Sequence, residues 1–193
     1  MGADSVNFQM LNRGKRSLAI DLKAPGARDR LRPLIEKADV IIEQFRPGVM
    51  ARLGLGYEDV RAINPDIIYC SITGWGQSGP KAEEAGHDLN YMAETGILGL
   101  SVGADDAPIL PPVLAADIAG GAYPATVNIL LALLRRHKTG EGCWIDVAMG
   151  ENLFLASFRF EKPLGRIYVS TLPYCLMLAL AVLLITYVPA IGV

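Results

Sequence analysis

Three short runs of apolar and β-branched residues, separated by stretches of helical character, most constrain the fold of this chain. They lie at residues 40–42, 67–73 and 143–147. Runs of this length and composition are typical of buried strands. The helical patterns between them favour parallel pairing, because a crossover helix returns the chain to the same end of the sheet. We therefore predict an α/β fold with a doubly wound, mainly parallel sheet.

The other expected elements lie around and between these runs. We expect a further strand at 17–22 and helices at 25–37, 57–63, 91–98 and 149–158. The longest helix begins at Asp117 and ends in cations before Gly140. Its apolar residues recur at helical spacing, and they are Tyr123, Val127, Leu130, Leu131 and Leu134. His137 lies among the cations of its last turn, so we interpret it as a helix-end charge rather than as a catalyst.

Composition excludes several classes of function. The net charge of −2 over 193 residues shows no excess of positive charge of the kind that indicates nucleic-acid binding. Cys70, Cys143 and Cys175 lie far apart, and no Cys/His cluster has metal spacing, so we expect buried thiols and no metal site. The N-terminus has no basic-then-apolar signal region, which favours the cytoplasm or an organelle matrix.

The C-terminal part differs from the rest, because residues 167–193 include no charged side chain. We expect residues 1–158 to form one α/β domain and residues 159–193 a hydrophobic tail. The apolar run between Pro173 and Pro189 is shorter than the roughly 20 residues of a membrane span, although the whole uncharged region would suffice. Membrane contact by residues 167–193 and a buried tail both stay open.

The candidate chemistry lies in His87, one of two histidines, and in Asp117. An imidazole titrates near neutral pH, and an apolar setting raises the pKa of a carboxyl group, so the two could act as base and acid. Gly86 would let the backbone approach a ligand. Equally, His87 could pack against Trp75 while Asp117 caps its helix. The residues alone leave both interpretations open.

The glycines at 74, 76 and 79 formally match a dinucleotide-binding fingerprint. That motif needs a helix to begin at its third glycine, and Pro80 follows at once. We interpret this segment as a glycine-rich loop instead.

Six motifs in one order carry a family resemblance across residues 6–158. They lie at 43–48, 52–56, 73–80, 85–91, 116–121 and 138–142. With them the chain resembles the family III CoA-transferases of the CaiB/BaiF type, and most of all their α-methylacyl-CoA racemase branch. The assignment to the racemase branch depends on His87, because the resemblance implies that the transferases have an aromatic residue at the matching position.

The resemblance implies a racemase that inverts the α-carbon of a 2-methylacyl-CoA thioester, with His87 and Asp117 exchanging the proton on opposite faces. The CoA thioester is then the substrate, and no cofactor is bound permanently. CoA transfer between carboxylic acids, with Asp117 as nucleophile, is the first alternative. A non-catalytic truncated protein is the second.

The resemblance also implies which residues contact CoA and the thioester. They are Ile20, Asp21, Leu22, Lys23, Gln44, Phe45, Arg46, Arg52, Gly86, Asp88, Leu89, Asn90 and Tyr91. Cations on loops suit the phosphates of CoA, although charged side chains are more often simply solvated. We prefer Lys23 and Arg52 over Arg46 for this role.

Family members begin with a strand, a helix and a further strand, end in a smaller domain, and interlock as homodimers. This sequence begins after the first of these parts, and from residue 159 it does not resemble the small domain. We therefore expect a partial doubly wound α/β domain that lacks the first βαβ part and the small domain. The interlocked homodimer is in doubt for such a chain.

Overall fold

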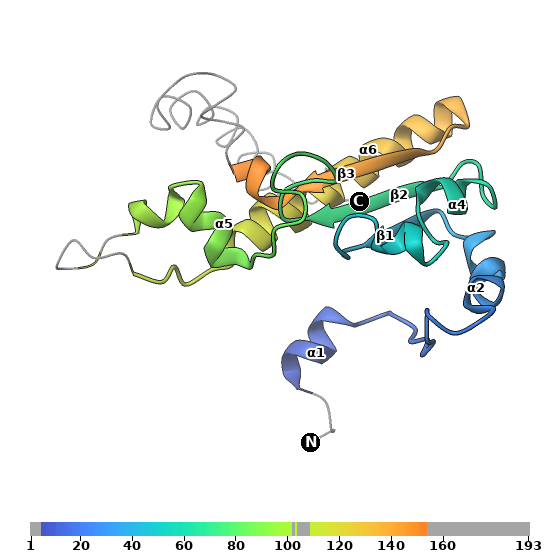
Figure 1. Ribbon diagram of the computed structural model, residues 1–193, viewed down its shortest axis with the longest axis horizontal. Helices are drawn as coiled ribbons and strands as arrows, with labels where there is room; N and C mark the ends of the chain where they lie inside the picture. Colours follow the sequence, from blue (N-terminus) through green and yellow to red (C-terminus); the bar gives the residue numbers. More distant parts are fainter. Residues whose placement is uncertain (1–4, 102, 104–108, 154–193) are drawn as a thin grey trace, which may run out of the picture.

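A computed structural model describes residues 5–101, 103 and 109–153 of the chain (Figure 1). Three strands, β1 (Val40–Glu43), β2 (Ile68–Thr73) and β3 (Cys143–Ala148), form one sheet in the order β1-β2-β3. Both strand pairs are parallel. The prediction of a parallel α/β sheet built from these three runs is confirmed.

Helices fill the connections between the strands. The N-terminal part holds α1 (Val6–Leu11), α2 (Ala27–Ile35), α3 (Val49–Arg52) and α4 (Tyr57–Arg61). Between β2 and β3 lie α5 (Asp88–Glu94), the 3-10 helix η1 (Ile97–Leu100), the π-helix η2 (Ala116–Ala122) and α6 (Tyr123–Thr139). Residues 149–153 are helical as well, and the rest of the helix expected at 149–158 lies outside the described residues.

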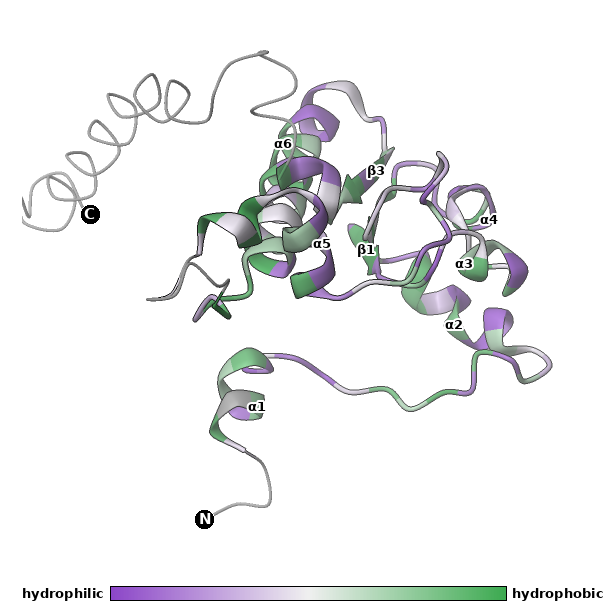
Figure 2. Cartoon of the chain, turned by 60° about the vertical axis from the view of Figure 1, so that its left-hand side comes forward, coloured by the Kyte–Doolittle hydropathy of each residue, from purple (hydrophilic) through white to green (hydrophobic). Residues whose placement is uncertain are grey.

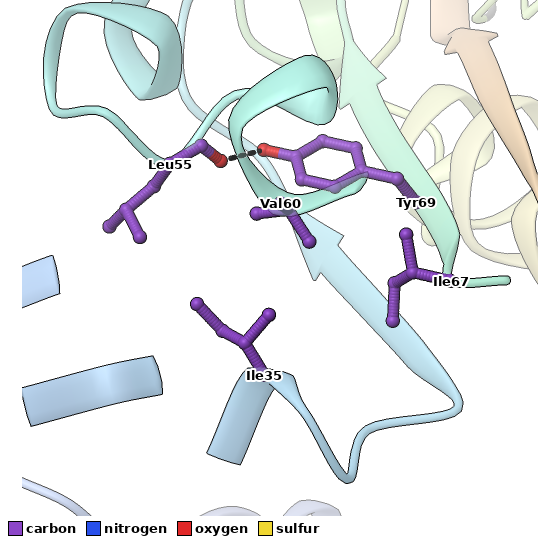
Figure 3. Packing of buried hydrophobic residues seen from close by; sticks show 5 residues of the cluster. All are labelled: Ile35, Leu55, Val60, Ile67 and Tyr69. Atoms are coloured by element: carbon purple, nitrogen blue, oxygen red, sulfur yellow. Dashed lines mark hydrogen bonds between the residues drawn. The ribbon is translucent and has the colours of Figure 1, made fainter. Parts of the chain in front are cut away.

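Side chains that alternate along β2 reach both faces of the sheet. Tyr69 packs with Ile35 of α2 and Val60 of α4 on one face (Figure 3). Its neighbour Cys70 packs with Ala125 of α6 on the other face. Helices therefore cover both faces, as the doubly wound prediction requires.

The C-terminal end of α6 is tied to the start of the sheet. Gly140 follows the helix with a φ of 74°, a left-handed conformation that ends a helix without a steric penalty. Arg136 in the last turn pairs with Asp39 just before β1, at 2.5 Å between Nη2 and Oδ1. It also donates to the carbonyl oxygens of Asp39 and Asp66. The predicted helix end, with His137 in its last turn, is confirmed.

The apolar stripe of α6 does not face the sheet. The helix packs on β2 and β3 through small residues, with Ala125 and Ala132 buried. The stripe predicted from helical spacing is exposed in the described part of the chain, and it comprises Tyr123, Val127, Leu130, Leu131 and Leu134. Figure 2 shows apolar residues along this helix. By length and composition Ala116–Thr139 is also apolar enough to cross a membrane, and 22% of its most apolar window is buried.

The strand predicted at 17–22 is wrong. A strand exists only where its N–H and C=O groups find ladder partners. Residues 15–21 have no regular structure and run apart from the sheet between α1 and α2 (Figure 1). The side chain of Leu18 is 60% exposed, while Leu22 alone of this segment packs against the cluster around Ile35.

Two further boundaries differ from the sequence interpretation. The helix expected at 91–98 begins earlier, at Asp88, and ends at Glu94. Gly96 then takes a φ of 80°, which breaks the helix before η1. The domain boundary at residue 158, the tail at 159–193 and Cys175 lie outside the described residues.

Replacing Tyr69 by Phe should lower the free energy of unfolding by about 1–3 kcal/mol. The Tyr69 hydroxyl donates to the Leu55 carbonyl oxygen at 2.9 Å, and the substitution leaves that buried oxygen unpaired (Figure 3). Urea denaturation measures the change. Tyr57→Phe is the matched control, and equal losses in the two variants would contradict the assignment.

Candidate active site

A pocket of about 600 Å³ lies at the carboxyl ends of the strands. Residues 44–47 follow β1, Thr73 ends β2 and Met149 follows β3, and all of them line it. His87 and Asp117 line the same pocket, although they lie thirty residues apart in the chain. The structure therefore brings the predicted pair together where open α/β sheets place their ligands.

His87 is the N-cap residue of α5 and has extended backbone geometry. Its N–H donates to Asn90 Oδ1 at 3.0 Å, and the Asn90 N–H donates to the His87 carbonyl oxygen at 2.8 Å. This reciprocal pair fixes the backbone of His87 at the start of the helix. The histidine itself is exposed and lies outside the cluster around Trp75, so the alternative of a packed histidine is wrong.

Asp117 lies in the first turn of η2 rather than at its cap. The N-cap is Ala115, whose own side chain makes no capping hydrogen bond. Instead, the Asp117 N–H donates to Asp88 Oδ1 at 2.8 Å. The alternative that Asp117 serves as a helix cap is therefore wrong, and its carboxyl group faces the pocket.

The pKa of Asp117 is raised above the ordinary value of an aspartate. Partial burial is the main cause, the negative charge of Asp88 adds to it, and His87 acts in the opposite direction. The sequence left open whether this pKa would rise or fall, and it rises. A carboxyl group with a raised pKa holds its proton more readily, which suits a general acid.

Tyr91 is 4% exposed and belongs to a cluster with Trp75, Met92 and Ala116. Its ring meets Trp75 edge-on, with centroids 5.4 Å apart. A Cβ atom on Gly86 would come within 2.7 Å of this ring, and one on Gly74 would also collide with it. Gly86 is thus needed to make room for Tyr91, and since it also lines the pocket, a close approach of its backbone to a ligand stays a prediction.

A second hollow of about 700 Å³ adjoins the first, since Phe45 lines both. Its wall includes Lys23 and Arg52, and the Lys23 N–H donates to Asp21 Oδ1 at 2.9 Å within the turn. Further members of this wall are Ile20, Leu22, Val49 and Leu53. Gln44, Phe45, Arg46, Gly86 and Tyr91 line the first pocket.

Three of the predicted contact residues do not line either hollow. Asp88 is buried at the Asp117 backbone, Asn90 holds the His87 backbone, and Leu89 is partly exposed on α5. Their contacts with a thioester stay predictions, whereas their contacts within the protein are defined.

Thr73 is a pocket residue that the sequence interpretation did not single out. It is 7% exposed, and its Oγ1 has no hydrogen-bond partner among the described residues. The available signal was its position, because a polar residue that ends a buried parallel strand lies at the ligand-binding edge.

The loop before His87 is anchored at two points. The Gln77 N–H donates to Asp146 Oδ2 on β3 at 2.9 Å, and Lys81 lies over the Trp75 ring, 4.7 Å from its centroid, while pairing with Glu94 of α5. No helix begins at Gly79. The decision against a dinucleotide site is therefore confirmed in this respect.

The family model of CoA-transferase family III matches residues 1–162. The chain belongs to CoA-transferase family III. It is 42% identical to α-methylacyl-CoA racemase of Mus musculus over 86% of this chain, and 38% identical to succinyl-CoA:glutarate CoA-transferase of Homo sapiens over 76% of it. A CAIB/BAIF family protein from Brucella suis has the same fold, with a TM-score of 0.70 and 41% identity over 77% of this chain.

This member of family III spans less than half the length of these relatives. It covers 43% of the mouse racemase, 33% of the human transferase and 39% of the Brucella suis chain. Racemases and transferases are similarly close to it, so membership in the family leaves the reaction to be argued from the site.

Replacing Gly86 by Ala should lower the free energy of unfolding by about 1–3 kcal/mol, because the added methyl group displaces the Tyr91 ring. Chemical denaturation followed by tryptophan fluorescence measures this, since Trp75 touches that ring. Gly99→Ala is the control, as a Cβ there meets nothing within 4 Å. An unchanged Gly86→Ala variant would contradict the packing described.

Proposed function

We propose that this chain carries the catalytic pair of a racemase that inverts the α-carbon of a 2-methylacyl-CoA thioester. The observation that carries the proposal is that His87 and Asp117, supplied by different helices, line one pocket at the carboxyl ends of the strands. The CoA thioester is the substrate, and no resident cofactor is part of the proposal.

The chemistry requires two groups of different character. A thioester acidifies the adjacent carbon, yet a base must still remove its proton and an acid on the other face must return one. An imidazole takes up a proton near neutral pH. Asp117, whose pKa is raised by burial and by Asp88, keeps a proton longer than an ordinary aspartate. In the reverse direction the two groups exchange roles.

Recognition of CoA is assigned to the second hollow. Lys23 and Arg52 supply positive charge there, and the side chains of both are exposed and lack ion pairs within the described residues. Phe45 lies where this hollow meets the catalytic pocket, and Arg46 lies on the catalytic side. A ligand with its phosphates near Lys23 and its thioester near His87 would follow this path.

The second candidate function is CoA transfer between carboxylic acids. It is favoured by the 38% identity to a human CoA-transferase and by the position of Asp117 at the pocket wall, where its carboxylate could attack a thioester. His87 has no part in that reaction, so the histidine at the pocket wall favours racemisation. A non-catalytic protein is the third candidate, because the chain spans less than half of its relatives.

In deuterated water, the chain should exchange the α-proton of a 2-methylacyl-CoA for deuterium. His87→Ala and Asp117→Asn should each slow the exchange by about 100-fold or more, since each removes one of the two proton-transfer groups. His137→Gln, which changes the other histidine, is the control. NMR of the substrate's α-proton measures the rate.

No exchange above background in a folded sample that binds CoA would contradict the racemase. Trapping an acyl adduct on Asp117 with hydroxylamine would favour the transferase instead. Failure of the folded chain to bind CoA would favour the non-catalytic protein.

Lys23→Ala and Arg52→Ala should each weaken CoA binding about 10-fold or more, because each removes a charge-assisted hydrogen bond to phosphate. Isothermal titration calorimetry with CoA measures the affinity. Lys37→Ala removes a charge outside both hollows and serves as the control. Equal effects of all three substitutions would indicate attraction by net charge alone.

A further inference from the structure

Asp88 is a buried carboxylate that the proton-transfer chemistry leaves unexplained. It is 7% exposed and does not line the catalytic pocket. Its Oδ1 accepts the Asp117 N–H at 2.8 Å, which is its one hydrogen bond to a described residue. A buried charge with so few partners is costly, so a neutral side chain of similar shape would serve the fold as well or better.

We propose that Asp88 is a positioning residue that holds Asp117 opposite His87. This inference rests on the function proposed above, because it concerns the geometry of the same pair.

Asp88 connects the start of α5 to the start of η2. Asp88 follows His87 directly, and the Asn90 cap fixes this start of α5. The start of α5 therefore carries both the imidazole of His87 and the Asp88 carboxylate that binds η2. Since Asp88 binds the backbone of Asp117, this hydrogen bond links the two helix starts that carry the catalytic groups.

The packing around that hydrogen bond supports the same role. Tyr91 and Met92 of α5 pack against Ala116, the residue before Asp117. Gly121, one turn on, lies against the side chain of Met149. Apolar contacts hold the two helices together, and the Asp88 hydrogen bond adds a directional contact to the first turn of η2.

Asp88 also acts on Asp117 electrostatically. Asp88 and His87 are the charged groups that shift the Asp117 pKa, the phenol of Tyr91 lies beside them, and Arg46 and Glu84 line the same pocket. The helix at 149–153 contributes the uncharged Met149. Asp88 raises the pKa of Asp117 and His87 lowers it, so Asp88 offsets the effect of a protonated His87. The Asp88 carboxylate then both positions Asp117 and helps the Asp117 carboxyl group to keep its proton.

Two substitutions separate the hydrogen bond that Asp88 accepts from Asp117 from the negative charge of Asp88. Asp88→Asn keeps an oxygen acceptor for the Asp117 N–H and removes the negative charge. It should lower the pKa of Asp117, which carbon-13 NMR of labelled aspartates detects. In the pH profile of the exchange rate, the limb that follows Asp117 should shift to lower pH. Asp88→Ala removes the hydrogen bond as well and should slow exchange at saturating substrate about 10–100-fold, with KM within twofold of wild type.

Glu58→Gln is the control, since it changes an exposed carboxylate on α4 that lies outside both hollows. A purely structural Asp88 would lower the folded fraction without moving the titration of Asp117 or the pH profile. Unchanged titration in a folded Asp88→Asn variant overturns the inference, as does wild-type exchange in Asp88→Ala. If Asp88→Ala does not fold, Asp88→Asn decides alone.

The two proposals fail in different ways. Absence of exchange in wild type, with CoA bound, overturns the racemase. The NMR titration of Asp117 in wild type and Asp88→Asn does not need turnover, so it still decides whether Asp88 controls Asp117.

Discussion

Parallel pairing of β1, β2 and β3 is the constraint on which the site depends. The register aligns Glu43, Ser71 and Asp146 across the sheet, so the three strands end near one edge. Segments that are far apart in sequence therefore meet there, with residues 44–47 after β1, the loop after Thr73 and the turn after β3. A change in the order or direction of any strand would separate these segments, and the pocket would not exist.

Helices α5 and η2 then bring the two catalytic residues to this edge of the sheet. His87 caps α5 and Asp117 lies in the first turn of η2, so both catalytic residues sit at helix starts and line the pocket at the strand ends. The Asp88 hydrogen bond joins the two starts, and Tyr91 fills the space beneath them between Gly74 and Gly86. The fold and the chemistry are thus coupled through the residues immediately after His87.

The sequence predicted the features with a strong local signal. Short apolar and β-branched runs placed the sheet, Gly140 and the cations before it placed the end of α6, and His87 with Asp117 gave the candidate pair. The segment at 17–22 alternates like a strand, but pairing depends on a neighbour that local pattern does not show. The need for Gly86 depends on how the Tyr91 ring packs, and the Asp88 contact joins residues 29 apart, so spacing along the chain could not give either.

The central claim is that His87 and Asp117 form one interacting pair, and the pKa of Asp117 tests it most directly. Carbon-13 NMR of labelled aspartates, with Asp117→Asn to assign the signal, would follow its titration in wild type and in His87→Ala. The account predicts a pKa above the ordinary aspartate value in wild type, rising further when the positive charge of His87 is removed. An ordinary pKa that does not respond to His87→Ala would contradict it.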